Sequence, residues 1–436
     1  MDAKPKAEHW LYVSFIASLP FATLFPLDLF GASVQFSDLI FLAAAVVWAF
    51  SVLTGRSKLR WSWFYVFLAA YAVSTLLSTV TSIDPSSSSI KLAGKFYLIA
   101  IPFLTFNLIT SAKVLKRVLQ GWFIGSCILL ACCLAGIIFF YTGLKDPSIN
   151  LVLHPIFGSL PTGNYPRIEG FFLYPAILCN FLGMTWMFAL LLTSAGWLRL
   201  RSLWLFAPVL FIVDIFTVTP GLGGILLVTG IFLATKLLRA RWVMLARAIL
   251  SGGTAAALIF LAAASITLFS YSPNGVRMPL LSGEVLPSHR AIAWQTAFET
   301  FSQNPIFGRG IGMPVSTAIY TDPSGTTQLL ADAHNTYLSV AGETGIVGIA
   351  AFFSVIGFVT LRLFRWKAVS DPEKTARLCL LLAMLDAFFY QSLSGSYEDM
   401  RHLWVLVGVI AAVTHGDYGF FSSPTVASLT SVSNLR

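Results

Sequence analysis

Apolar segments long enough to cross a membrane recur along nearly the whole chain, and they limit its fold more than any other feature. A transmembrane helix needs about 20 mostly apolar residues. About twelve segments meet this requirement, and we expect spans at residues 10–30, 36–54, 62–82, 88–109, 118–142, 170–194, 203–219, 222–238, 248–270, 336–361, 378–394 and 402–418. The pattern predicts an all-α polytopic membrane protein.

The composition leads to the same fold class. Of the 436 residues, 57% are hydrophobic and 11% are charged, whereas a soluble domain has about 25% charged residues. One water-soluble core cannot hide this much apolar surface, so the bilayer must be the solvent for most of it. The five cysteines all fall inside apolar segments, which argues against a disulfide framework and against a Cys-ligated metal site.

Basic residues gather on one side of the predicted spans. If the spans alternate in direction, one side holds twenty of the 28 Lys and Arg residues, namely Lys4, Lys6, Arg56, Lys58, Arg60, Lys113, Lys116, Arg117, Arg199, Arg201, Lys236, Arg239, Arg241, Arg247, Arg362, Arg365, Lys367, Lys374, Arg377 and Arg436. An excess of basic residues marks the cytoplasmic side. We therefore expect an inner-membrane protein with both termini in the cytoplasm. The net charge of +9 then reflects topology and does not indicate a nucleic-acid partner.

Two predicted loops on the outer side are longer than a simple turn. They cover residues 144–168 and 271–335, and the second is long enough for a small subdomain. Within it, residues 289–302 have apolar side chains at helical spacing and predict an amphipathic helix. The expected organisation is nine spans in 1–270, a periplasmic subdomain in 271–335, and three spans with a short cytoplasmic tail in 336–436.

Eight basic residues lie on the outer side, against the topology rule, and four of them are candidates for binding an anionic headgroup. Lys91 and Lys95 stand four residues apart, hence on one helix face, where they either snorkel to the interface or form a cationic wall. Arg167 precedes a span and Arg290 begins the loop helix; each is either a surface residue or a bidentate partner of phosphate oxygens. Together these four cations predict a diphosphate site.

Further candidates lie in the large loop and beyond it. His334 stands where the loop meets a span, so it can either accept a proton from an attacking hydroxyl or merely accompany Asn335, a candidate helix cap. Arg309 and Arg401 are weaker candidates for substrate binding, either on the surface or behind the site.

Some kinds of chemistry have no support in the sequence. The outer acidic residues are scattered, apart from the adjacent Glu398 and Asp399, and hard cations need several oxygen ligands together. There is also no Walker-type loop, no Gly-x-Ser-x-Gly and no Cys/His pair in the outer loops. We therefore expect Arg and Lys, without metal or another cofactor, to neutralise a leaving phosphate.

Two stretches of the chain resemble a known family. SHRAIAWQTAFETFSQNPIFGRGIGMP, followed by DAHNTYLSVAGETGIVGIAAFF, is similar to the shared core of bacterial O-antigen ligases and O-antigen polymerases. The family's helix-opening Arg, Pro-x-x-Gly-x-Gly turn and His-Asn-x-Tyr-Leu element correspond here to Arg290, Pro305, Gly308, Gly310, His334, Asn335, Tyr337 and Leu338. Upstream, RIEGFFLYP resembles the family's Arg-x-x-Gly…Pro element, with Arg167, Gly170 and Pro175.

The chain departs from the family pattern at two points. Ala176 stands where the family often has Asn, and TPGLGG, from Thr219 to Gly224, stands where it often has a Ser-Arg-Gly turn. The second departure weakens any role assigned to that turn.

The resemblance implies a metal-independent, inverting, GT-C-like glycosyltransferase of the bacterial inner membrane with its site facing the periplasm. Its donor would be a glycan on undecaprenyl diphosphate and its acceptor a sugar hydroxyl of lipid A–core, so that transfer completes lipopolysaccharide. His334, Arg290 and Arg167 would be catalytic. The residues expected to bind substrate are Lys91, Lys95, Asn335, Tyr337, Arg309 and Arg401.

Several alternatives stay open at this point. The first alternative is the polymerase of the same superfamily, which also releases undecaprenyl diphosphate. Protein O-oligosaccharyltransferases are another alternative, but they commonly have a further C-terminal periplasmic region. A transporter of an anionic lipid would need charge deep in several helices, for which Asp214 and Asp386 are the candidates. A purely structural scaffold would leave the arrangement of Arg and His residues unexplained.

Overall fold

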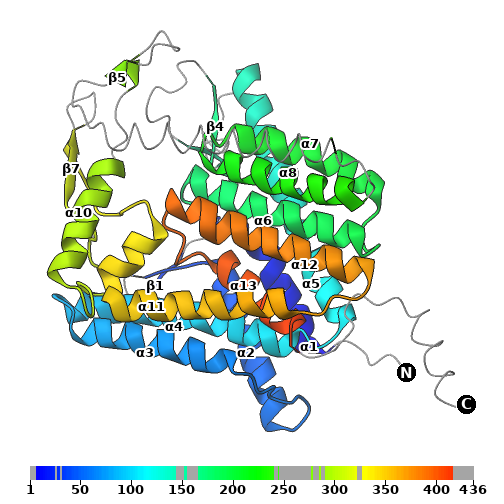
Figure 1. Ribbon diagram of the computed structural model, residues 1–436, viewed down its shortest axis with the longest axis horizontal. Coiled ribbons are helices and arrows are strands. Elements are labelled where there is room, and N and C mark those ends of the chain that lie inside the picture. The colour runs from blue at the N-terminus through cyan, green and yellow to red at the C-terminus, as the bar shows by residue number, and fades with distance from the viewer. Residues whose placement is uncertain are drawn as a thin grey trace, which may run out of the picture.

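The computed structural model describes residues 6–24, 27–29, 32–143, 152–154, 165–239, 244, 276–277, 284–285, 290–321 and 327–415. These residues are mainly helical, and the long helices run side by side (Figure 1). The helices are α1 (Ala7–Ser18), α2 (Phe36–Leu53), α3 (Phe64–Val80), α4 (Pro85–Leu108), α5 (Ala112–Thr142), α6 (Pro175–Ser194), α7 (Leu200–Ile215), α8 (Gly221–Arg239), α10 (Arg290–Gln303), α11 (Thr336–Arg365), α12 (Asp371–Met384), the π-helix η2 (Leu385–Tyr390), the 3₁₀-helix η3 (Gln391–Leu393) and α13 (Arg401–Val413).

In the part of the chain that the structure describes, the strands form four short antiparallel pairs. They pair β1 (Leu27–Leu29) with β2 (Ala32–Val34), β3 (Leu153–His154) with β4 (Arg167–Ile168), β5 (Val276–Arg277) with β6 (Glu284–Val285), and β7 (Ala318–Thr321) with β8 (Thr327–Leu330). Arg167 thus lies in β4, opposite His154.

The helices confirm a polytopic membrane architecture. Within the described residues, seven helical stretches are long and apolar enough to cross a membrane: α2, α4, α5, α6, α8 up to Leu238, α11, and α12 continued through η3 to Leu393. The apolar helices α3 and α13 are shorter. The predicted span 248–270 lies outside the described residues, so the number twelve stays a prediction. The domain boundaries at 270 and 335 stay predictions as well.

The first predicted span, 10–30, is shorter in the structure than expected. Helix α1 ends at Ser18, and Leu19 and Pro20 form a turn. Proline has no backbone N–H and clashes with the preceding helical turn, which explains the early end. The backbone N–H of Thr23 donates to Phe171 O at 3.0 Å, so the chain after the turn packs beside the start of α6.

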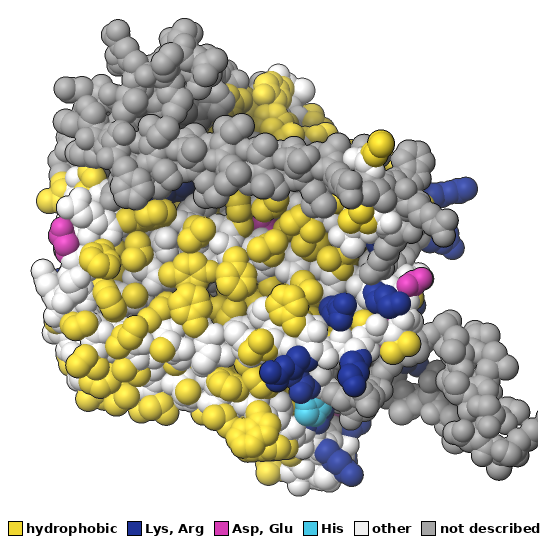
Figure 2. Space-filling view, in the orientation of Figure 1, with side chains coloured by type: hydrophobic (Ala, Val, Ile, Leu, Met, Phe, Trp, Pro, Cys, Tyr) yellow, Lys and Arg dark blue, Asp and Glu magenta, His cyan; other side chains and the backbone are white. Residues whose placement is uncertain are grey.

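Helix α6 is the centre of the bundle. In its 18-residue apolar window, 89% of the residues are buried, and the helix packs against α5, α7, α8 and α12. The outer helices instead expose large apolar side chains, including Leu53, Trp204 and Leu205, which are 86%, 72% and 77% exposed. Figure 2 shows apolar side chains over much of the flank. Such a surface suits contact with lipid tails.

The basic loops meet at one end of the bundle. Lys6 Nζ donates to Ser57 Oγ at 2.8 Å, and Arg60 Nη1 donates to Ile109 O at 2.8 Å. Figure 2 shows Lys and Arg side chains gathered at this end, opposite α10 in Figure 1. We call it the basic end and the opposite one the α10 end. The grouping is the one that the alternating pattern of the sequence predicts.

Candidate active site at the α10 end

His334 lies in a strained turn just before α11. Its φ of 49° is in the left-handed region, which is uncommon for a residue other than glycine. The turn is held by Asp332: its Oδ1 accepts the backbone N–H of His334 at 2.9 Å, and its Oδ2 is 3.7 Å from the His334 Nδ1. The imidazole is 44% exposed, so it is accessible from outside while its backbone is fixed.

Asp332 also ties neighbouring segments to this turn. Its Oδ1 accepts hydrogen bonds from the hydroxyls of Ser339 in α11 and Ser396 in the 394–400 loop. From the sequence alone, Asp332 is one of several scattered outer acids, and this role is not predicted. The available signal was its position two residues before His334, because Asp side chains commonly bond the backbone two residues on.

Arg290 brings the start of α10 to the same place. Its guanidinium is close enough to Asp332 and Tyr397 for electrostatic interaction. The positive charge of Arg290 in turn lowers the pKa of both His334 and Arg167. Burial lowers the pKa of Arg290, and these two neighbours oppose that effect. Arg167, Arg290 and His334, the three predicted catalytic residues, therefore lie together, although 167 residues of sequence separate the first from the last.

Arg167 is held by the turn between α7 and α8. Its Nε donates to Thr217 O at 3.2 Å, and the next residue, Ile168, donates its backbone N–H to Phe216 O at 2.9 Å. Burial, followed by repulsion from Arg290, lowers the pKa of Arg167. Two guanidinium groups that repel each other form a site that favours an anion between them.

Although the imidazole is 44% exposed, partial desolvation has the largest effect on the pKa of His334. It lowers the pKa of the imidazole below its ordinary value of 6.5, and Arg290 lowers it further, while Asp332 raises it. His334 is thus mainly neutral at pH 7, the form that accepts a proton.

A mainly apolar cavity of about 550 Å³ adjoins the place where Arg167 is anchored. It is lined by Tyr165, Ile215, Phe216, Val218, Thr219, Pro220 and Leu222. The cavity shares Phe216 with the hydrogen bonds that hold β4. An apolar chain attached to an anion on Arg167 would find a matching surface there.

Two other predicted cations are engaged with carboxylates elsewhere. Lys95, which is 3% exposed, places its Nζ 2.6 Å from Asp399 Oδ1 and 3.4 Å from Glu343 Oε2. Arg401 forms a two-pronged ion pair with Asp38, with both N···O distances 2.6 Å. These cations form a network apart from Arg167 and Arg290, so the four-cation site of the sequence analysis is divided in the structure.

Lys91 lies at the edge of this second network. Its side chain is exposed and packs on Gly312, while its charge acts on Asp399. Burial opposes ionisation of Asp399, but Lys95 and then Lys91 outweigh it and hold the pKa of Asp399 below its ordinary range.

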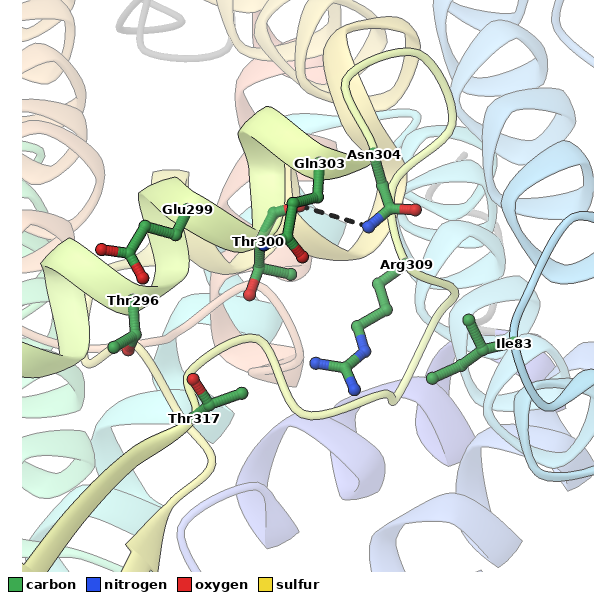
Figure 3. A pocket seen from close by; sticks show the side chains of 8 residues that line it. All are labelled: Ile83, Thr296, Glu299, Thr300, Gln303, Asn304, Arg309 and Thr317. Atoms are coloured by element: carbon green, nitrogen blue, oxygen red, sulfur yellow. Dashed lines mark hydrogen bonds between the residues drawn. The ribbon is translucent and has the colours of Figure 1, made fainter.

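Arg309 points into a separate polar pocket (Figure 3). The pocket has a volume of about 410 Å³ and is lined by Ile83, Thr296, Glu299, Thr300, Gln303, Asn304, Arg309 and Thr317. Arg309 Nη1 donates to Pro314 O at 3.4 Å. The guanidinium is therefore a third, distinct positive centre at the α10 end.

Asn335 and Tyr337 build the start of α11. Asn335 caps the helix, because its side-chain oxygen accepts the backbone N–H groups of Tyr337 and Leu338 at 3.0 and 3.1 Å. Its amide donates to Leu393 O at 3.3 Å. The Tyr337 hydroxyl donates to Phe388 O, and its ring stacks on Phe353. Both side chains fix the scaffold next to His334, and substrate binding by either stays a prediction.

The turn from Pro305 to Gly310 follows α10 and packs against α11 at a point where that helix is broken. Gly345 interrupts α11 with a φ of 64° and a ψ of −165°. The N–H of Ile346 bonds Pro305 O at 2.8 Å, and the N–H of Arg309 bonds Gly342 O at 2.8 Å. The turn thus satisfies backbone groups that the break leaves open and fixes α10 against the helix that His334 precedes.

Residues 207–353 match the family model described as O-antigen ligase. The match covers about a third of the chain and supports an O-antigen ligase/polymerase superfamily member. The matched range runs from α7 into α11, so it contains Arg290 and His334 but not Arg167. No curated protein matches the chain.

The family domain holds most of the geometry described above. It includes the turn between α7 and α8 that anchors Arg167, the whole of α10, and the turn that fills the break in α11. Among the residues described by the structure, no group of three or more His, Cys, Asp or Glu side chains is arranged to hold a metal ion.

Proposed function

We propose that the chain is an O-antigen ligase, which transfers a glycan from undecaprenyl diphosphate to a sugar hydroxyl of lipid A–core and so completes lipopolysaccharide. The observation that carries the proposal is the convergence of Arg167, Arg290 and His334 beside an apolar cavity. The two arginines suit the diphosphate, the cavity suits the first isoprene units, and the neutral imidazole suits an attacking hydroxyl.

In this mechanism the acceptor oxygen attacks the anomeric carbon of the donor. A new C–O bond forms as the bond from the anomeric carbon to the diphosphate oxygen breaks, and the electron pair stays on the diphosphate. His334 accepts the hydroxyl proton and later passes it to water. Arg167 and Arg290 stabilise the departing negative charge, which is the larger contribution. One direct displacement inverts the anomeric centre, and no metal takes part.

The orientation in the membrane belongs to the same proposal. The basic end would face the cytoplasm and the α10 end the periplasm, because basic loops are retained on the cytoplasmic side. The site would then meet donor and acceptor lipids in the outer leaflet of the inner membrane.

The decisive test is reconstitution of the purified protein with lipid-linked O-antigen and lipid A–core, without nucleotide and with a chelator present. The expected product is glycan joined to lipid A–core. Longer glycan chains on undecaprenyl diphosphate, formed without the acceptor, would identify the polymerase of the same superfamily instead. Failure to form any joined product, or a requirement for divalent metal, would reject the ligase mechanism.

Two substitutions test the residues. We expect Arg290→Ala and His334→Ala each to lower the transfer rate by at least about 10²-fold, the typical effect of losing one preorganised partner. Arg199→Ala, which removes an exposed arginine at the basic end, is the control and should keep the wild-type rate. Comparable expression and thermal stability of all three variants separates lost chemistry from lost folding. Wild-type activity in either test variant would remove that residue from the site.

A further inference from the structure

Two carboxylates are buried among α6, α7, α8 and η2. Asp214 of α7 and Asp386 of η2 are both 0% exposed, and their charges act on each other. No lysine or arginine in the described part of the chain forms an ion pair with either of them. A buried charge without a partner is costly in a bilayer and marks a functional position by default.

The same region has more hydrogen-bond acceptors than donors. Oδ1 of Asp386 and Oε1 of Gln391 are buried without a hydrogen-bond partner, and the Asp214 carboxylate is approached by only one weak donor, the Cys179 thiol. Gln391 is 0% exposed, and its Nε2 donates to Asp386 Oδ2 at 3.0 Å. Buried polar atoms almost always have a partner. The three side chains thus carry more buried acceptor oxygens than the described residues supply with donors, a setting that suits a positively charged occupant.

These side chains lie around the glycines of α6 and α8. A Cβ placed on Gly221 would lie 2.5 Å from Cys179 Sγ and 2.8 Å from Gln391 Oε1, and the Cys179 thiol in turn interacts with Asp214. On the other side, Cβ atoms on Gly183 and Gly224 would lie 2.0 Å and 2.2 Å from the Asp386 carboxylate oxygens. The glycines of α6 and α8 thus make the room in which the carboxylates sit.

Irregular backbone surrounds this space on two sides. Asp386 lies in a π-helix, a rare element that is frequent at functional sites. A second irregular segment is the turn between α7 and α8. There Val218 has a φ of 51°, a genuine outlier for a β-branched residue. Interrupted helices in membranes supply the backbone oxygens of many cation sites.

We propose that Asp214 and Asp386, with Gln391 Oε1, bind a small monovalent cation, either a proton or a sodium ion. Oxygen ligands suit both, and the described residues provide no cluster for a transition metal. The titratable groups that face the pair are Cys179 on α6, Tyr390 on η2 and Tyr397 on the 394–400 loop. Near them, His402 on α13 bonds Asn180, and α8 contributes Gly221 and Gly224.

The cation site is close to the arginine site but independent of the proposed transfer reaction. Tyr397 interacts with Asp386 and Cys179 on one side and with Arg290 on the other. Thr217 bonds the backbone of Asp214 through its hydroxyl and accepts Arg167 through its carbonyl. The presence or absence of the cation therefore changes the charge close to Arg167 and Arg290.

The sodium arm of the test uses the full-length protein in detergent. Thermal unfolding is followed with sodium chloride and, at equal ionic strength, with N-methylglucamine chloride. If sodium is the occupant, it raises the midpoint of the wild type by a few degrees through mass action, and the shift is lost in Asp214→Asn and Asp386→Asn. The control, Asp371→Asn, removes an aspartate that is 89% exposed at the basic end and keeps the shift.

The proton arm uses infrared spectroscopy of protein labelled with carboxyl-¹³C aspartate. If a proton is the occupant, sodium has no effect, and wild-type protein at neutral pH shows the carbonyl band of a protonated aspartic acid. That band is lost in one or both Asn variants and kept in Asp371→Asn. A wild-type protein with neither a sodium shift nor this band overturns the proposal, even if a variant fails to fold. A shift or band that persists in both Asn variants overturns it as well.

Discussion

At the scale of single residues, the site depends on a balance of opposing effects on His334. Burial and Arg290 favour the neutral imidazole, whereas Asp332 favours the protonated one. Asp332 is also the residue that fixes the turn. The same carboxylate therefore positions the imidazole and keeps it from losing too much basicity, as partners of a general base often do.

This balance predicts the pH dependence of transfer. The neutral form of His334 is needed, so the rate falls as the pH drops through its lowered pKa, below 6.5. Asp332 raises that pKa, so Asp332→Asn should lower it further and move the acid limb of the rate profile to lower pH. The measurement is the initial transfer rate from pH 4.5 to 8 for both proteins. An acid limb that stays in place or moves to higher pH would contradict this assignment.

At the scale of elements, the sequence predicts helices well where apolar length decides and poorly where tertiary contacts decide. The predicted loop helix 289–302 coincides with α10, because its apolar spacing already specifies the helix. The break in α11 was not predicted: its position depends on the turn from Pro305 to Gly310, which lies 35 residues before Gly345 in the sequence. Nothing local near Gly345 indicates that partner.

The break gives a prediction with a control in the same helix. A Cβ on Gly345 would lie 2.3 Å from Ile306 O, and the φ of 64° with a ψ of −165° is a backbone conformation essentially restricted to glycine, which alone costs another residue about 1–3 kcal/mol. Gly345→Ala should therefore lower the thermal midpoint and loosen the contact between α10 and α11. Gly357→Ala, where a Cβ meets nothing within 4 Å, should be neutral or stabilising by up to about 1 kcal/mol. Equal midpoints for the two variants would argue against the turn as the lock on α11.

At the scale of the whole molecule, the sequence indicates which residues are candidates for the site, but not which of these candidates lie together. Arg167, Arg290 and His334 stood out because they oppose the topology bias or match a motif, and they meet. Lys95 and Arg401 stood out for the same reason, yet Asp399, Glu343 and Asp38 neutralise them. Which outer cations are paired with carboxylates depends on contacts between helices far apart in sequence, and single-residue signals do not contain that information.

The orientation of the bundle is the last prediction, and labelling in intact cells tests it. Ser302, exposed on α10, and Lys367, at the basic end, can each be replaced by cysteine in a protein whose five native cysteines are changed to alanine or serine. A membrane-impermeant maleimide added outside, with the outer membrane permeabilised, should label position 302 and not position 367. After inner-membrane lysis both should react. The physical reason is that basic loops are costly to translocate, and the basic end collects them from six separate loops and termini within the described residues. Labelling of position 367 before lysis would mean that the basic end faces the periplasm and the α10 end faces the cytoplasm. A ligase with its site at the α10 end could not then meet its acceptor.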